Sequence, residues 1–407
     1  MAEPEFRVYG QRWAILLAFM FAVALNQLLW ITFAPITGSA AAFYGVSDLS
    51  IGLLSMSFMI VYILVSIPAS WVIDTYGFRV AVGIGAVLTG IFGLLRGLPT
   101  ADYTLVLISQ IGIAIGQPLI LNSVTKVAAR WFPLQERATA SGFGSLAMYL
   151  GIVLGMVLTP FLAGQSGIAT MLLIYGIVSV VAAIVFLAVA RERPPTPPCP
   201  SGQDERALVF DGLKQALRKR DFLLLMVVFF IGLGVFNAVT TWIEDIVRPR
   251  GFTSVQAGII GGLMVAAGIV GALVLPTLSD RYRRRVPFII LAIGGAIVGL
   301  VGVTFASGYA LLLLSAFVLG FFLLSAAPIG FQYGAETTFP APEGTSNGLL
   351  LQMGQISGVV FILAMDAFKS PATGSMTTSL VVLIGLMVLG LLLSTRLRES
   401  AMMTGGA

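Results

Sequence analysis

Apolar runs of about 20 residues, separated by short polar or charged clusters, follow one another along most of this chain. A helix of this length spans the hydrocarbon core of a bilayer, because each helical residue rises by about 1.5 Å. The pattern predicts an all-α membrane protein. We expect twelve membrane-spanning helices near residues 13–36, 50–73, 80–98, 104–127, 138–163, 169–190, 222–248, 255–277, 287–306, 310–333, 346–368 and 377–395.

A long polar segment, residues 191–221, divides these helices into two groups of six. It begins with a proline-rich stretch, which is typical of an extended linker. Residues 207–218 then carry apolar side chains at helical spacing, which predicts an amphipathic helix on the membrane surface. We therefore expect an N-terminal half at 1–190, a cytoplasmic linker at 191–221 and a C-terminal half at 222–407.

Two short motifs occur once in each half. Asp74-Thr-Tyr-Gly-Phe-Arg79 follows the second helix, and Asp280-Arg-Tyr-Arg-Arg-Arg285 follows the eighth, 206 residues further along. Phe132-Pro-Leu-Gln-Glu136 precedes the fifth helix, and Phe339-Pro-Ala-Pro-Glu343 precedes the eleventh, at an offset of 207 residues. Two nearly equal offsets predict two parallel six-helix pseudo-repeats.

The charged residues of these motifs are interpreted as latch and gate residues on the inner side. Asp74 at a helix end, Gly77 in the tight turn and Arg79 at the next helix start are expected to form a charge-paired latch. The acids at the fifth and eleventh helices are expected to cap helix N-termini or to brace the inner gate. These two acids are Glu136 and Glu343, and Asp280 is the counterpart of Asp74 in the second half.

Lys and Arg concentrate on one side of the predicted topology. With both termini cytoplasmic, 19 of the 23 basic residues fall in inner segments, and the outer side keeps Arg96, Arg248, Arg250 and Lys369. This distribution follows the positive-inside rule and predicts an integral cell membrane protein (inner or plasma membrane) with both termini inside. Topology and lipid headgroups therefore explain the net charge of +5, and we expect no nucleic-acid partner.

Composition excludes several other classes of protein. The chain is 58% hydrophobic and 10% charged, and it contains one cysteine and no histidine. No phosphate-binding loop and no His-based metal motif occurs. We therefore expect no enzyme, no cofactor and no metal site, but a carrier of a small-molecule solute that works as a monomer. Gly112-x-x-x-Gly116 and Gly151-x-x-x-Gly155 predict close contacts between helices.

Twelve helices in two parallel halves, with Asp-x-x-Gly-x-Arg between the second and third, resemble the major facilitator superfamily. Other stretches resemble the feline leukaemia virus subgroup C receptor family, also called solute carrier family 49: Trp30-Ile31, Pro68-Ala-Ser-Trp71 and Glu336–Gly348. The first resemblance implies alternating access around a central cavity. Members of the second family are associated with choline and ethanolamine, with haem and with pyridoxine.

The second resemblance also implies substrate contacts. The family builds its choline pocket from a Trp in the first span and Gln residues in the fourth and eleventh, which match Trp30, Gln117 and Gln355. A further aromatic of the family, a tyrosine in the seventh span, corresponds to Asn237. Asn26 lies one helical turn before Trp30 and is a further candidate, with an interhelical hydrogen bond as the alternative.

The inventory of charges agrees with a non-anionic substrate. No Arg or Lys lies in the middle of a span, and Arg96 and Lys126 lie near helix ends, where snorkelling to the interface explains them. A Trp face attracts an organic cation by roughly 0.5–2 kcal/mol, and amides orient a hydroxyl group. The sequence therefore predicts a secondary transporter of a small organic cation or polar amine, choline-like, acting by facilitated uniport.

Glu244 supports an alternative function. It shares a helical face with Asn237 and Thr241 near the outer end of the seventh helix. It is interpreted as an outer-gate residue, as a coupling acid or, preferably, as a solvated helix-end acid near Arg248. The alternative is a proton-coupled exporter of amphipathic drugs or metabolites that uses Glu244. A non-transporting receptor is a third class.

Overall fold

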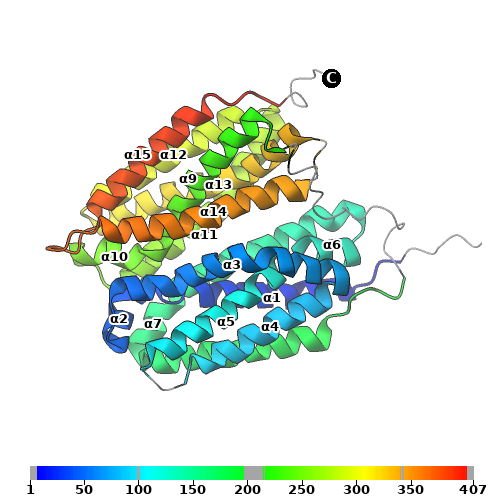
Figure 1. The fold of residues 1–407 in the computed structure, drawn as a ribbon, viewed down its shortest axis with the longest axis horizontal. Helices are drawn as coiled ribbons and strands as arrows, with labels where there is room; N and C mark the ends of the chain where they lie inside the picture. Colours follow the sequence, from blue (N-terminus) through cyan, green and yellow to red (C-terminus); the bar gives the residue numbers. More distant parts are fainter. Residues whose placement is uncertain are drawn as a thin grey trace, which may run out of the picture. The chain divides into compact units, whose positions relative to one another are not determined.

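Regular structure in the described part of the chain consists of helices alone (Figure 1). The computed structural model describes residues 7–98, 101–196, 214, 216–339, 341 and 343–400, apart from the side chains of Leu134 and Glu343. Within these ranges, eleven helices are long and apolar enough to cross a membrane. This confirms the all-α membrane fold. The predicted amphipathic helix at 207–218 falls almost wholly outside the described residues.

The chain divides into two compact units. One contains Met1–Phe33 and Ser39–Glu205, and the other contains Ala34–Gly38 and Arg206–Ala407. The helices of the first part of the chain are α1 (Gln11–Ile31), η1 (Ala34–Ile36), α2 (Thr37–Tyr44), α3 (Asp48–Tyr76), α4 (Phe78–Leu95), α5 (Tyr103–Leu121), α6 (Val124–Trp131) and α7 (Leu134–Val189). Those of the second are α9 (Arg220–Thr241), α10 (Ile243–Val247), η2 (Arg248–Arg250), α11 (Ser254–Tyr282), α12 (Val286–Phe305), α13 (Tyr309–Thr338), α14 (Glu343–Ala367) and α15 (Thr377–Ser394).

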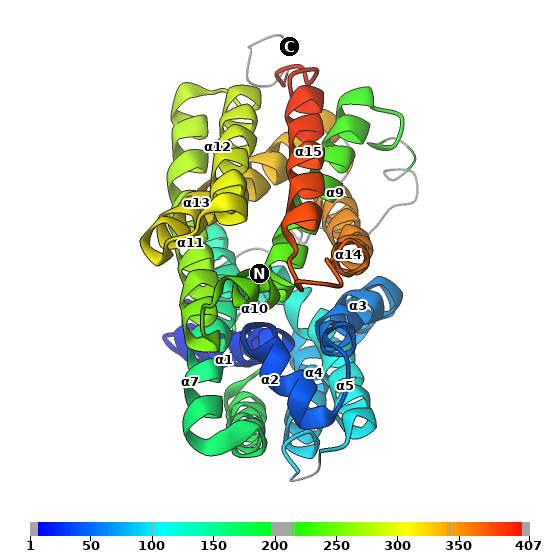
Figure 2. The ribbon, with the colours of Figure 1, turned by 90° about the vertical axis from the view of Figure 1, so that its left-hand side faces the viewer.

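The long element α7 contains two helices that meet at Gly167. A straight helix of its 56 residues would be about 84 Å long, far more than a bilayer core of about 30 Å. Gly167 adopts φ +80°, a conformation that favours glycine, and the chain reverses there (Figure 2). The hydroxyls of Thr159 and Tyr175 lie 3.0 Å apart, so the two arms run side by side. Counted separately, they bring the spanning helices of the described chain to twelve.

Small residues let the helices of the N-terminal unit approach closely. A Cβ at Gly151 would overlap the backbone of Ala24, and one at Gly155 would meet Leu28 and Ile31, so α7 packs directly on α1. The predicted close contact at Gly151-x-x-x-Gly155 is thereby confirmed. Gly112 and Gly116 likewise face α4, against Phe92 and the Gly85 carbonyl.

The first predicted span, at residues 13–36, is broken in the structure. Helix α1 ends at Ile31, and the short helix η1 follows at Ala34–Ile36. Pro35 has no N–H group, so the hydrogen bond that would continue the helix from residue 35 to the Ile31 carbonyl does not form. The segment Ala34–Gly38 belongs to the C-terminal unit, whereas α1 belongs to the N-terminal unit.

Candidate functional site

Trp30 lies in the last turn of α1 and is 6% exposed. Its indole Nε1 donates a hydrogen bond to the Ser55 carbonyl at 3.1 Å, and the Ser55 hydroxyl donates back to the Trp30 carbonyl at 3.5 Å. Both bonds join α1 to α3. A buried indole needs a partner for its N–H, and with this one satisfied only the faces of the ring remain for a ligand.

The carbonyl groups at the end of α1 are satisfied by side chains of neighbouring helices. The Leu29 carbonyl accepts from Arg96 Nη1 at 3.1 Å and from Gln110 Nε2 at 3.2 Å. Arg96 also donates to Gln110 Oε1 at 2.8 Å and, through Nη2, to Thr32 Oγ1 at 3.1 Å. The last carbonyls of a helix have no partner within it and carry partial negative charge, so a buried cation here stabilises the helix end.

Arg96 corrects a prediction made from the sequence. Snorkelling predicts a guanidinium at the membrane interface, but Arg96 is 2% exposed and lies over the Phe33 ring at 5.7 Å. The free carbonyls at the end of α1 and the Gln110 amide hold it inside.

Asn26 is fully buried one turn before Trp30. Its Nδ2 atom lies 3.2 Å from Thr89 Oγ1 and 3.4 Å from the Ile113 carbonyl, and its Oδ1 atom accepts from Gln27 Nε2 at 3.4 Å. The amide therefore connects α1 with α4 and α5. These contacts agree with the interhelical alternative for this residue.

The amides of Gln117 and Gln355 differ from that of Asn26. Gln117 lies on α5, one residue before Pro118, and is 7% exposed, while Gln355 lies half-buried on α14. Within the described part of the chain, neither side-chain amide makes a hydrogen bond. Several other amides within the spans are bonded, for example Asn122, which accepts from the Tyr62 hydroxyl at 2.8 Å, whereas Gln352 of α14 makes no hydrogen bond within the described residues. The donors and acceptors of the two glutamines are thus available to a ligand.

Asn237 lies on α9 in the C-terminal unit and is 9% exposed. Its Nδ2 atom donates to the Gly354 carbonyl at 3.0 Å, next to Gln355 in the chain. A Cβ at Gly354 would meet Leu233, and one at Gly234 would meet Phe361 and Ser357. Helices α9 and α14 therefore pack closely, and Asn237 supports the turn of α14 that carries Gln355.

Glu244 is not the solvated acid that the sequence favours, since it is 3% exposed. Its carboxylate accepts the Gly38 N–H at 3.0 Å and pairs with Arg248 at 3.0 Å. Its neighbour Asp245 is fully buried and pairs with Arg248 at 2.7 Å and with Lys369 at 2.8 Å. Opposite charges lie against both carboxylates, and Glu244 also accepts a backbone N–H, which lowers the cost of burying them.

The Asp74 latch has a different partner from the predicted Arg79. Asp74 pairs with Lys126 at 3.1 Å, since the turn at Gly77, with φ +86°, separates Asp74 from Arg79. The Arg79 N–H donates instead to Glu192 at 2.8 Å. Arg79 thus contributes a backbone donor at the start of α4, and its side chain is exposed.

The equivalent motif of the C-terminal unit contains a buried ion pair. Arg285 pairs with Asp280 and, at 3.0 Å, with Glu336. Burial lowers the pKa of Arg285, but the hydrogen bonds to Asp280 and Glu336 outweigh it and hold the pKa above its ordinary value. Glu136, in the first turn of α7, pairs with Arg12 at 3.1 Å. Helix α14 begins at Glu343, whose side chain lies outside the described residues.

The structure thus brings Asn26, Trp30 and Gln117 into one unit, and Asn237 and Gln355 into the other. Sequence reasoning missed two supporting residues, Ser55 and Gln110, and placed a third, Arg96, at the interface. Their signal in the sequence is a polar side chain in or beside an apolar span, which alone does not identify a partner. In the described part of the chain, no three His, Cys, Asp or Glu side chains lie close enough to hold a metal ion.

Comparisons with known proteins identify the family. The family model of the Major Facilitator Superfamily matches residues 16–362, so the chain belongs to this superfamily and is a membrane transporter, not an enzyme. Within it, the chain belongs to solute carrier family 49. Solute carrier family 49 member A3 of Xenopus tropicalis is 32% identical over 90% of this chain and 80% of that protein.

Two further matches agree with this assignment. The choline/ethanolamine transporter flvcr2b of Danio rerio is 29% identical over 98% of this chain and 87% of that protein. A bacterial homolog of the human lysosomal transporter Spinster, solved inward-facing and unoccupied, superposes with a TM-score of 0.77 at 18% identity, over 96% of this chain and 98% of that chain. The second match shows the fold.

Proposed function

We propose that this transporter carries a small organic cation or polar amine, choline-like, with Trp30, Gln117 and Gln355 as substrate contacts. The observation that carries the proposal is that the side-chain amides of Gln117 and Gln355 have unused hydrogen-bonding capacity. Both lack a hydrogen-bond partner in the described part of the chain, whereas the amides of Asn26 and Asn237 bind helix neighbours. Both amides keep some exposure to water, Gln117 at 7% and Gln355 half-buried, and a substrate hydroxyl or amine would replace water as their partner.

Trp30 supplies the cation-binding part of the proposal. Its N–H is bound to Ser55, so the π-face is the remaining feature for a ligand. A quaternary ammonium over an indole is stabilised by roughly 0.5–2 kcal/mol without a carboxylate. Relatives that bear the name choline/ethanolamine transporter, such as flvcr2b of Danio rerio, support the same substrate class.

Facilitated uniport by alternating access is the mechanism we propose. Glu244, the candidate coupling acid, is paired with Arg248 and accepts the Gly38 N–H, so protonating it would break the ion pair of a buried carboxylate. The chain contains no histidine to relay protons at neutral pH. These observations favour uniport over the proton-coupled exporter.

The topology of the proposal follows from the distribution of charge. We propose that both termini are cytoplasmic, that residues 1–190 and 222–407 are the two halves joined by the linker 191–221, and that the monomer is the functional unit. The 19 basic residues that fall in inner segments support this orientation.

Uptake of radiolabelled choline into proteoliposomes tests the function and the contacts together. Gln117→Met and Gln355→Met remove the amides at nearly constant volume and are each expected to raise the KM about tenfold, from the loss of one bond to the substrate. Gln165→Met, an exposed glutamine of α7, is the matched control. Wild-type vesicles that take up neither choline nor ethanolamine would overturn the substrate class. Normal uptake by both variants would overturn the contacts alone.

A further inference from the structure

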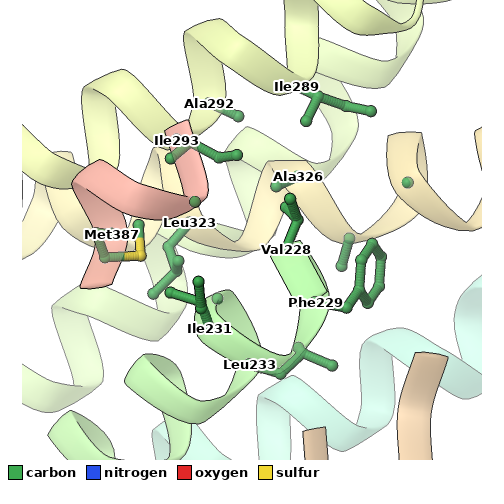
Figure 3. Close-up of a pocket in the computed structure, with 14 residues that line it drawn as sticks. Val228, Phe229, Ile231, Leu233, Ile289, Ala292, Ile293, Leu323, Ala326 and Met387 are labelled. Carbon is green, nitrogen blue, oxygen red and sulfur yellow. The ribbon is translucent and has the colours of Figure 1, made fainter. Parts of the chain in front are cut away.

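The C-terminal unit encloses an apolar crevice among α9, α12, α13 and α15 (Figure 3). Its volume is about 40 Å³, and every residue that lines it is apolar. The inner end is formed by fully buried side chains of α12 and α15, among them Ile289, Ala292 and Met387. Gly232, Leu233 and Ala326, on α9 and α13, are half-buried, so the crevice opens between these two helices.

Small residues keep this space empty. Gly232 and Ala326 line the opening, and a Cβ added at Gly232 would meet nothing within 4 Å. At Gly330 the ring of Phe229 occupies the place of a side chain, so the opposite wall is tightly packed. Protein interiors are normally filled to crystal-like density, which makes a persistent apolar void between well-packed helices a candidate ligand site.

The mouth of the crevice lies next to the turn of α14 that carries a proposed substrate contact. Leu233, at its mouth, packs against Gly354, the residue before Gln355. The Gly354 carbonyl also receives the amide of Asn237, one turn beyond Leu233 on α9. The lining residues come from α9, α12, α13 and α15, so a ligand whose polar head contacts Gln355 has this apolar space on the other side of Leu233.

We propose that this crevice binds an alkyl arm of the substrate, so that the preferred substrates are amines with a short apolar chain. The inference rests on the proposed function, because it takes Gln355 as the contact for the polar head. A space of about 40 Å³ has room for about three water-sized groups, which corresponds to an arm of about three carbons. The apolar lining favours methylene groups and excludes a second charge or hydroxyl.

A lipid acyl chain is the competing occupant. The buried walls of α12 and α15 close the crevice at its inner end, and the opening lies beside the turn that carries Gln355. A short alkyl arm, bonded to a polar head that contacts Gln355, fits a crevice closed at its inner end better than a lipid chain of many methylene groups.

A series of N-alkyl analogues of choline tests the inference in proteoliposomes. Ethyl, propyl and butyl groups replace one N-methyl group, and each analogue competes with radiolabelled choline uptake. We expect inhibition to strengthen about fourfold for each methylene until about three have been added, and then to level off. Ala326→Leu fills the mouth and should bring the ratio of the inhibition constants of the propyl analogue and choline close to one. Ala310→Leu, at an exposed position on the same helix, should keep the wild-type ratio.

Thermal stabilisation of purified protein by the same analogues gives a second readout if a variant does not transport. Choline uptake with a flat alkyl series would overturn the crevice assignment and leave the proposed function standing. Failure of choline and of every analogue to compete or to stabilise would overturn the proposed function itself. Equal inhibition by uncharged alkanols, or an unchanged ratio in Ala326→Leu, would point to a lipid-like occupant and reject the amine.

Discussion

Trp30 and Ser55 are bonded in both directions across the α1–α3 contact, indole N–H to carbonyl at 3.1 Å and hydroxyl to carbonyl at 3.5 Å. The indole is thus fixed by its edge. Because α1 ends one residue later, the bonds also fix the direction in which the helix ends.

Trp30→Phe is expected to weaken choline binding on the order of threefold to tenfold, because phenyl is a poorer cation–π partner and loses the bond to Ser55. The KM for choline uptake measures the change. Trp13→Phe changes a tryptophan of the same helix that is 40% exposed, and it should leave the KM unaltered. An equal KM in both variants would remove Trp30 from the site.

Arg96→Met should lower the free energy of unfolding by on the order of 2–3 kcal/mol, because the Leu29 carbonyl and the Gln110 amide lose a charged, buried partner. Arg96→Lys should recover part of the loss, since an ammonium group lacks the planar geometry that reaches several acceptors at once. Thermal unfolding in detergent measures both. Arg79→Met, at an exposed arginine, is the control, and a similar drop in Tm there would contradict the assignment.

The ion pairs of the two Asp motifs should contribute differently to the free energy of unfolding. Glu336→Gln breaks an ion pair with Arg285 in which the side chains are 6% and 5% exposed, and we expect a loss of about 3–5 kcal/mol. Asp74→Asn breaks the pair with Lys126, with side chains 42% and 23% exposed, and should cost about 1 kcal/mol or less. Double-mutant cycles on thermal stability compare the pairs. Equal coupling energies would contradict the difference in burial.

Gly77→Ala should destabilise the protein by about 1–2 kcal/mol, because φ is +86° and a Cβ would meet the Glu192 carboxylate. Gly164→Ala, in helix α7, is the matched control, because a Cβ at this position would meet nothing within 4 Å. This substitution should be neutral or slightly stabilising. Thermal unfolding measures the Tm of both variants. A Tm of Gly77→Ala equal to or above that of Gly164→Ala would contradict the prediction.

Choline uptake should not respond to a proton gradient between about pH 6 and pH 8, because the chain has no histidine and Glu244 is held by Arg248 and Gly38. Initial rates with and without an imposed gradient give the test. Acceleration by an outward gradient, with the vesicle interior acidic, that disappears in Glu244→Gln would support the proton-coupled exporter instead.

The sequence by itself determined the spans, because the length of an apolar run must match the bilayer whatever the helix packs against. The span predicted at 13–36 missed the end of α1 at Ile31, although Pro35, which lacks the N–H that a continuing helix needs, was the signal for it. The membership of the superfamily was recognisable from the half-repeat and the Asp74 motif. The partner of Asp74 was not recognisable, because an ion pair depends on which helices become neighbours.

Only the tertiary structure decided the state of each polar side chain. Asn26 and Gln117 look alike in the sequence, each an amide in an apolar span, yet Asn26 is bonded to α4 and α5 while Gln117 makes no side-chain hydrogen bond to the residues that the structure describes. Arg96 and Glu244 were assigned to solvent or the interface because they lie near helix ends, and both are buried. Hydrogen-bond partners from distant helices outweigh the cost of burial at both residues, and such partners are set by packing rather than by local sequence.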